Sequence, residues 1–61
     1  MTARQVIKRL QAEGWYEVAQ ESSHKQFKHD EKPGRVTVPM HGSKDIPKGT
    51  LGSIKRQAGW R

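Results

Sequence analysis

The sequence contains no cysteine and no long hydrophobic run, and two tryptophans, one tyrosine and one phenylalanine are its only aromatic residues. Without cysteine there is no disulfide, which fits a reducing cytoplasm. No segment approaches the ~20 apolar residues of a membrane span. Residues 1–10 mix Arg4, Lys8 and Arg9 with apolar residues, which is not a signal-peptide pattern. We therefore expect a cytoplasmic protein that makes no membrane contact.

Acidic residues are also few: the sequence has 6 Asp and Glu but 12 Lys and Arg, which gives a net charge of +6. The charges of residues 1–23 sum to zero, so residues 24–61 carry the whole excess. A cationic field of this kind favours a nucleic acid or an acidic protein as partner, although a solvated basic surface is the alternative. At 61 residues the chain forms one domain, 1–61, of marginal stability that a bound partner could increase.

Helix signals occur at both ends of the sequence. Thr2 and Gln5 fit a capping box, and the apolar spacing that follows predicts a helix over 2–13 that stops at Gly14. A second helix is predicted to begin near Pro47. Its apolar stripe is narrow, and Gly59 ends it; the stripe consists of Leu51, Ile54 and Ala58.

Between the helices, alternating residues predict strands over 15–20, 24–29 and 35–40, joined by turns at 21–23 and 30–34. Short hairpin turns make the three strands antiparallel.

The order α-β-β-β-α predicts an α+β fold, because one face of the sheet can cover both amphipathic helices while the other faces solvent. Pro39 lacks an amide hydrogen, so the third strand ends there or lies at an edge. Phe27 should face the core, with Lys25 and His29 on its side of the second strand and able to reach solvent near its ends. The opposite side then carries His24, Gln26 and Lys28.

Several short motifs, weak singly, occur in an order and spacing that resemble the HicA family, the toxins of HicAB toxin–antitoxin pairs. They are Gly14-Trp15, Ser23-His24, Val36-Thr37-Val38-Pro39-Met40-His41-Gly42, Ile46-Pro47-Lys48-Gly49-Thr50-Leu51, Ile54 and Gln57-Ala58-Gly59. The resemblance covers nearly the whole chain.

The resemblance implies a fold similar to double-stranded-RNA-binding domains and a ribonuclease that cuts messenger RNA. It also implies that His24, from the family's Gly-Ser-His motif, is essential, and that a HicB-type antitoxin binds the toxin in a hetero-oligomeric complex and masks its active site. The usual glycine of that motif is Ser22 here. A glycine would permit a left-handed turn at this position, whereas serine adopts that conformation at a cost.

Histidine is the residue type here best suited to acid–base chemistry at neutral pH, since its unperturbed pKa is near ~6.5. A metal-free ribonuclease needs a base for the RNA 2′-hydroxyl, an acid for the leaving oxygen and cations for the phosphorane charge. His24 could act as base or acid; an exposed strand-end histidine without a role is the alternative.

Besides His24, five residues are candidates for substrate binding. Ser23 could donate a hydrogen bond to a phosphate oxygen, and Lys25 and Lys28 could hold phosphates. His41 could be the second proton-transfer group, an RNA contact, or a loop residue that caps the second helix. Lys48 could contact phosphate, while Gly49 is more easily explained by close packing against the sheet.

No metal or cofactor is expected. The histidines His24, His29 and His41 lack ligand spacing, and the carboxylates are scattered. His29 is interpreted as a strand-end surface residue. Phe27 and at least one tryptophan are expected in the core, while Trp60 could pack, stack on a base or be covered by a partner.

Two rival functions remain open from the sequence. A non-catalytic RNA-binding module of the same fold would use the basic residues after position 23 for backbone contacts. A basic interaction protein with an acidic partner is the third class. Only Ser23-His24 and the resemblance favour the enzyme over these.

Overall fold

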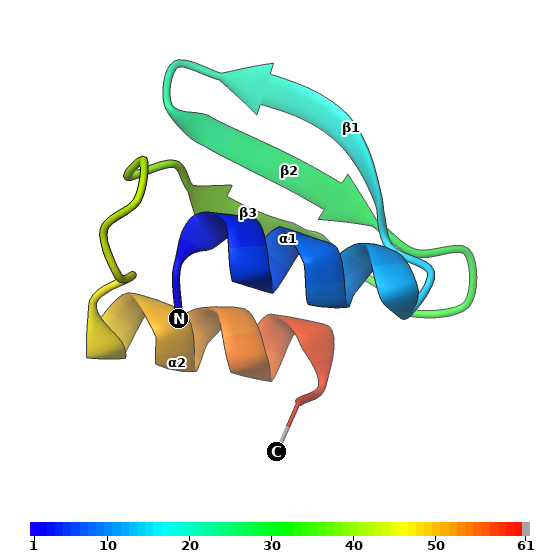
Figure 1. The fold of residues 1–61 in the computed structure, drawn as a ribbon. Helices are drawn as coiled ribbons and strands as arrows, with labels where there is room; N and C mark the ends of the chain where they lie inside the picture. The colour runs from blue at the N-terminus through cyan, green and yellow to red at the C-terminus, as the bar shows by residue number, and fades with distance from the viewer. Residues whose placement is uncertain (61) are drawn as a thin grey trace.

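Two helices cover one face of a three-stranded antiparallel sheet in the computed structural model, which describes residues 1–60 (Figure 1). This confirms the predicted order α-β-β-β-α. The elements are α1 (Ala3–Ala12), β1 (Tyr16–Glu21), β2 (His24–Lys28), β3 (Val36–Pro39) and α2 (Lys48–Ala58).

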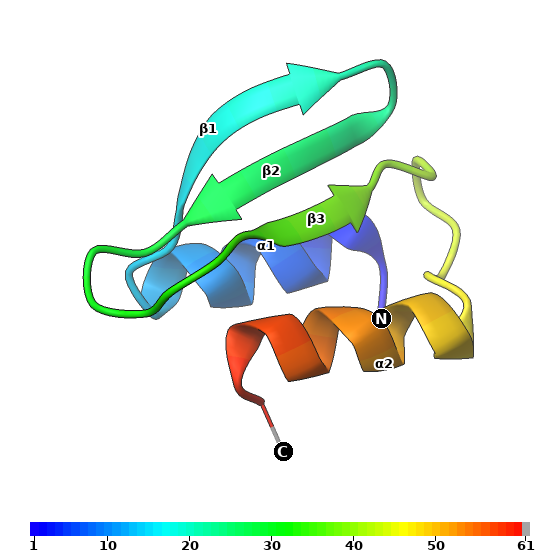
Figure 2. The ribbon, with the colours of Figure 1, turned by 180° about the vertical axis from the view of Figure 1, so that it is seen from behind.

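The sheet has the order β1-β2-β3, so β2 is central and pairs antiparallel with both neighbours. Seen from either side, α1 and α2 lie below the sheet and nothing covers its other face (Figures 1 and 2). As predicted from Pro39, β3 ends at that residue and lies at an edge. The amide of Thr37 on this edge donates to Oε1 of Gln57 in α2, at 3.1 Å. The helix thereby satisfies a donor that an open edge would expose.

The predicted capping box starts α1. The Thr2 amide donates to Oε1 of Gln5 at 2.9 Å, and the Gln5 amide donates to Oγ1 of Thr2 at 3.2 Å. The helix ends at Ala12, and Gly14 follows with φ +97°. Because L side chains rarely adopt that backbone angle, glycine at position 14 is what lets the chain turn from α1 into β1.

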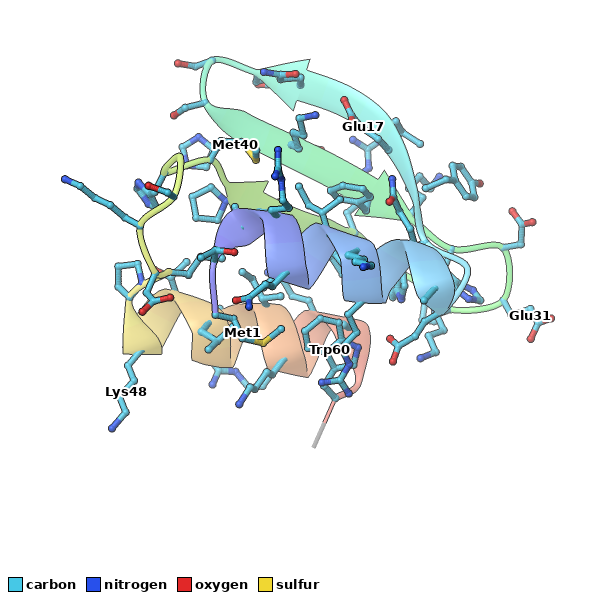
Figure 3. All side chains as sticks on the ribbon, in the orientation of Figure 1. Met1, Glu17, Glu31, Met40, Lys48 and Trp60 are labelled. Carbon is cyan, nitrogen blue, oxygen red and sulfur yellow. The ribbon has the colours of Figure 1, made fainter. Side chains whose placement is uncertain are left out.

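Every helix and strand except β1 contributes to one buried core, together with the segments beside them. It contains both tryptophans, so the expectation for Phe27 and at least one tryptophan is confirmed. Its members are Ala3, Val6, Leu10, Trp15, Phe27, Val36, Val38, Ile46, Ile54, Ala58 and Trp60. Trp60, for which the sequence left three alternatives, packs against α1 below its C-terminal half (Figure 3). Its Nε1 donates to the carboxylate of Glu13, and the Arg9 guanidinium lies 4.0 Å from its ring centre.

His29 lies just after the end of β2, close to the strand end predicted for it, but it is half-buried and has a structural role that the sequence did not indicate. Its ring meets Trp15 edge-on, with 5.3 Å between ring centres. The amides of Glu31 and Lys32 donate to Nδ1 at 3.0 and 3.3 Å, so the proton is on Nε2, which donates to the Glu13 carbonyl at 2.9 Å. His29 therefore links the β2–β3 loop to the end of α1, because both of its ring nitrogens form hydrogen bonds with backbone groups.

The interpretation of Gly49 as a packing glycine is wrong. It lies in the first turn of α2 and is exposed, and a Cβ added to it would have no atom within 4 Å. The sheet does not approach this position, so nothing in the packing requires glycine there.

The β1–β2 hairpin turns through two residues, Ser22 and Ser23, between the paired residues Glu21 and His24. Ser22 has φ +55° and is the one non-glycine residue with positive φ within residues 1–60. The turn thus keeps the left-handed conformation that the motif's usual glycine would adopt more easily, although serine occupies position 22. The backbone just before His24 is therefore strained.

We expect Ser22→Gly to raise the free energy of unfolding by about 1 kcal/mol, because glycine has no Cβ to crowd the carbonyl in a left-handed conformation. The urea midpoint measures this change. Ser23→Gly is the matched control, since position 23 does not have positive φ. There, added chain entropy should lower stability by roughly 0.5 kcal/mol. Equal shifts in both variants would contradict the strain argument.

Candidate functional site

The candidate site lies at the end of the molecule where the β1–β2 turn, the β3–α2 loop and the starts of both helices come together (Figures 1 and 2). Backbone hydrogen bonds join these segments. The Met40 amide donates to the Ser23 carbonyl at 2.7 Å, and the Ile46 amide donates to the Met1 carbonyl at 2.8 Å. Both ends of the β3–α2 loop are thus fixed, one to the hairpin turn and the other to the start of α1.

His24 opens β2 at this end and is exposed on the solvent face of the sheet. Its Cα partners are Glu21 in β1 and Pro39 in β3. Directly opposite residues of antiparallel strands have Cβ atoms about 5 Å apart on the same face. The hairpin therefore places Glu21 directly opposite His24 on the solvent face of the sheet.

Glu21 was not among the residues predicted from the sequence. The sequence pattern put Glu21 in a predicted turn at 21–23, whereas the structure has a two-residue turn at 22–23 that pairs Glu21 with His24. Gln26, one position along the same face, donates through Nε2 to Oε1 of Glu21 at 3.1 Å. Arg35 in turn donates through Nη1 to Oε1 of Gln26 at 2.7 Å. This row of side chains across the sheet holds the Glu21 carboxylate over the face that carries His24.

The structure separates the predicted phosphate ligands. Ser23 lies in the turn directly before His24 and is exposed. Lys25 projects toward the helix side of the sheet, where its Nζ lies 3.2 Å from Oε1 of Glu17. Lys28 is on the same face as His24 but at the other end of β2, about 13 Å away for four residues of strand. Of these three, Lys25 faces away from His24, Lys28 is distant along the strand, and Ser23 precedes His24 in the turn.

His41 and Lys48 both come from this end of the molecule. His41 is exposed in the loop after β3, and its carbonyl accepts from the Lys44 amide at 3.2 Å. It does not cap α2, whose N-cap is Pro47 with no side-chain hydrogen bond. Lys48 is exposed at the start of α2 and points away from the sheet (Figure 3). The loop thus brings His41 to the same end as His24, while Lys48 faces outward.

Tyr16 occupies the far end of the solvent face, opposite Lys28. Its hydroxyl donates to Oδ1 of Asp30 at 3.0 Å, and this hydrogen bond, with the charge of the carboxylate, raises the pKa of the Tyr16 phenol above its usual value. The phenol therefore stays protonated at neutral pH and is no candidate for a general base.

Within residues 1–60, no three His, Cys, Asp or Glu side chains are grouped so that they could hold a metal ion. In the same part of the chain, neither helix has the length and apolar character needed to cross a membrane. What the site does offer is an accessible imidazole beside a carboxylate, with a second imidazole on the neighbouring loop. Such a set can accept, donate and stabilise a proton.

A family model and a solved structure are similar to this chain. A family model described as the HicA toxin of bacterial toxin–antitoxin systems matches residues 3–60. A chain in a solved structure described as a toxin–antitoxin complex from Streptococcus pneumoniae is similar in fold, with a TM-score of 0.78. It is 27% identical in sequence, and the match covers 97% of each chain. No curated protein sequence matches the chain.

Proposed function

This chain belongs to the HicA family of toxins, and we propose that it is the toxin of a type II toxin–antitoxin system, a metal-independent endoribonuclease that cuts messenger RNA in the cytoplasm and so inhibits translation. The observation that supports this most strongly is His24, exposed at the head of β2 with Glu21 opposite it. The net charge of +6 suits a polyanionic substrate.

In the proposed reaction, His24 takes the proton of an RNA 2′-hydroxyl, and the 2′-oxygen attacks the adjacent phosphorus. The bond to the 5′-oxygen breaks, that oxygen takes a proton, and a 2′,3′-cyclic phosphate remains. His41 is the candidate donor of that proton, because its loop lies at the same end as His24. Ser23 is the candidate donor to a non-bridging oxygen, and Lys25, Lys28 and Lys48 are candidates for contacts with phosphates further along the strand.

The direct test is incubation of the purified protein with a long RNA in excess EDTA. We expect full cleavage and fragments ending in 2′,3′-cyclic phosphate. If the protein binds RNA with a steep dependence on salt and leaves it uncut, the hypothesis of a non-catalytic RNA-binding module replaces the hypothesis of a ribonuclease. Cleavage that EDTA abolishes would contradict the metal-independent mechanism.

Replacing Glu21 by glutamine should lower kcat roughly three- to tenfold. The carboxylate stabilises the positive charge that develops on His24 when it accepts a proton, and an interaction of about 1 kcal/mol corresponds to this factor. Glu17→Gln is the matched control, because Glu17 lies on the same strand but pairs with Lys25 on the helix side. Both variants lose one negative charge, so both should lower KM slightly. An equal kcat for the two would contradict the role of Glu21.

The solved relative is described as part of a toxin–antitoxin complex, and we extend that arrangement to this chain. A HicB-type antitoxin should cover His24, since free enzyme would damage the RNA of its own cell. The basic charge of residues 24–61 would attract an acidic antitoxin surface and speed association. A hetero-oligomeric complex that left His24 open to RNA and still active would contradict this masking.

A further inference from the structure

A pocket of about 410 Å³ opens beside the candidate site, between the start of α1 and the β3–α2 loop. Its lining, which we call the Met40 pocket, consists of Thr2, Arg4, Met40, Gly42 and Ser43. The volume falls within the range of small-ligand sites, about 300–1,000 Å³. Because α1 and the loop are well separated in sequence, the pocket exists only in the folded chain.

The Met40 pocket lies on the helix side of the sheet, because Met40 packs against the core, whereas the His24 side chain is on the solvent face; the two sites are linked through the end of β3. The Met40 amide donates to the carbonyl of Ser23, the residue that precedes His24, at 2.7 Å. Pro39, the Cα partner of His24, is the residue before Met40. In Figure 3, Met40 lies between the hairpin turn and the start of α1. A polymer bound at His24 would reach this pocket by passing around the end of β3.

The walls of the pocket are already held in place. Besides the Met40 hydrogen bond, the Lys44 amide donates to the His41 carbonyl at 3.2 Å, and Thr2 forms an isolated bridge with Asp45. The loop thus needs little further ordering when a ligand binds, which favours affinity.

Arg4 supplies the charge of the pocket. It is exposed in the first turn of α1, and among the residues that the structure describes it forms no ion pair. By contrast, Arg9 of the same helix pairs with Glu13. The guanidinium of Arg4 is therefore available to a phosphate, which it can hold through two parallel N–H donors.

The other lining residues suit the remaining parts of a nucleotide. Ser43 is exposed and brings a hydroxyl that can donate to a phosphate oxygen. Gly42 has φ +62°, and a Cβ there would have no atom within 4 Å. A ligand can therefore approach the Gly42 backbone closely. Met40 is half-buried and offers a polarisable thioether to an aromatic base.

We propose that the Met40 pocket is a subsite for one nucleotide of the RNA next to the scissile phosphate. Arg4 and Ser43 bind the phosphate of that nucleotide, and Met40 packs against its base. The inference rests on the proposed ribonuclease function and adds to it a residue, Arg4, that fixes how the strand enters the site.

The test compares short RNAs that differ by one nucleotide. A minimal substrate around a mapped cleavage step is extended by one nucleotide on its 5′ side or on its 3′ side, and kcat/KM is measured for each. For the parent protein, one of the two extensions should raise kcat/KM about tenfold, the effect of one charge-assisted contact. Arg4→Ala should lose that gain and cut the minimal substrate as before. Ser43→Glu, which puts a carboxylate into the pocket, should also lose it.

Arg56→Ala is the matched control, because it removes the same side chain and charge from an exposed position in the last turn of α2. It should keep the gain from the extension. If Arg4→Ala keeps the gain, or if both arginine variants lose it equally, the subsite is overturned while the ribonuclease function stands.

A binding measurement separates the subsite from catalysis. Fluorescence anisotropy with 2′-O-methyl oligonucleotides of increasing length, which offer no free 2′-hydroxyl, should show the same step in affinity and its loss in Arg4→Ala. This holds even if the parent cuts no RNA, the result that would refute the proposed function alone. If Arg4→Ala weakens binding of an acidic antitoxin and leaves oligonucleotide binding unchanged, the pocket serves a protein partner and the proposal is overturned.

Discussion

Replacing His24 by alanine is expected to lower the rate of RNA cleavage by at least about 100-fold, the contribution of one general acid or base. The fold should be unaffected, because the side chain is exposed on the solvent face of the sheet and is no part of the core. A change in the free energy of unfolding within about 0.5 kcal/mol is expected for such a position. Cleavage of a long RNA in EDTA and thermal unfolding, measured on the same samples, check both halves of the prediction.

His24→Asn sharpens the comparison. Asparagine keeps a polar side chain that can hydrogen-bond to RNA, but it cannot transfer a proton at neutral pH. Equal loss in the alanine and asparagine variants supports acid–base catalysis, whereas recovery in His24→Asn indicates a binding role. A folded, pure His24→Ala protein that still cuts RNA at the parent's rate would contradict the assignment of His24 as the catalytic residue.

His41→Ala then tests which residue donates the second proton. This variant should have a lower kcat if His41 is the acid, and an unchanged kcat if His41 is only a loop residue.

Gly14→Ala should lower the free energy of unfolding by about 3 kcal/mol. Two effects add, since φ is +97° and an added Cβ would lie 2.9 Å from Nε2 of His29. The left-handed backbone costs roughly 1–2 kcal/mol. Displacing His29 weakens its hydrogen bonds to the backbone of Glu13, Glu31 and Lys32, each worth about 1 kcal/mol. For a domain of 61 residues this is a large part of a total stability of roughly 3–9 kcal/mol.

Two other glycines separate these effects. Gly34 has φ +80°, but a Cβ there would meet nothing within 4 Å, so Gly34→Ala should show only the backbone cost of about 1–2 kcal/mol. Gly49 lies in α2 without positive φ and with open space around it, so Gly49→Ala should stabilise by roughly 0.5–1 kcal/mol. Urea unfolding of the three variants measures all three changes. If Gly14→Ala lowers the free energy of unfolding no more than Gly34→Ala does, the clash with His29 does not contribute to the loss of stability.

The three glycines also show where sequence patterns were sufficient and where they were not. Gly14 was predicted as a helix stop from the apolar spacing before it, a local signal that the backbone obeys. Gly49 was assigned to packing against the sheet, and this was wrong. The spacing of residues in the sequence does not give the distance between a helix and the sheet. The contacts of His29 were missed for the same reason. Its partners, Trp15 and the Glu13 carbonyl, precede it by 14 and 16 positions in the chain, and only the tertiary fold brings them together.

By itself, the sequence determined the properties that depend on near neighbours in the chain. These are the capping box at Thr2, the alternation that turns Phe27 inward and His24 outward, and the end of β3 at Pro39. Each follows from the backbone preferences of a few consecutive residues. The tertiary structure alone decided which distant groups meet. It packed Trp60 on Arg9 and formed the Met40 pocket from the first turn of α1 and a loop about 40 residues later. Those contacts depend on how the helices dock on the sheet, because burying their apolar faces fixes the positions of all the polar side chains around them.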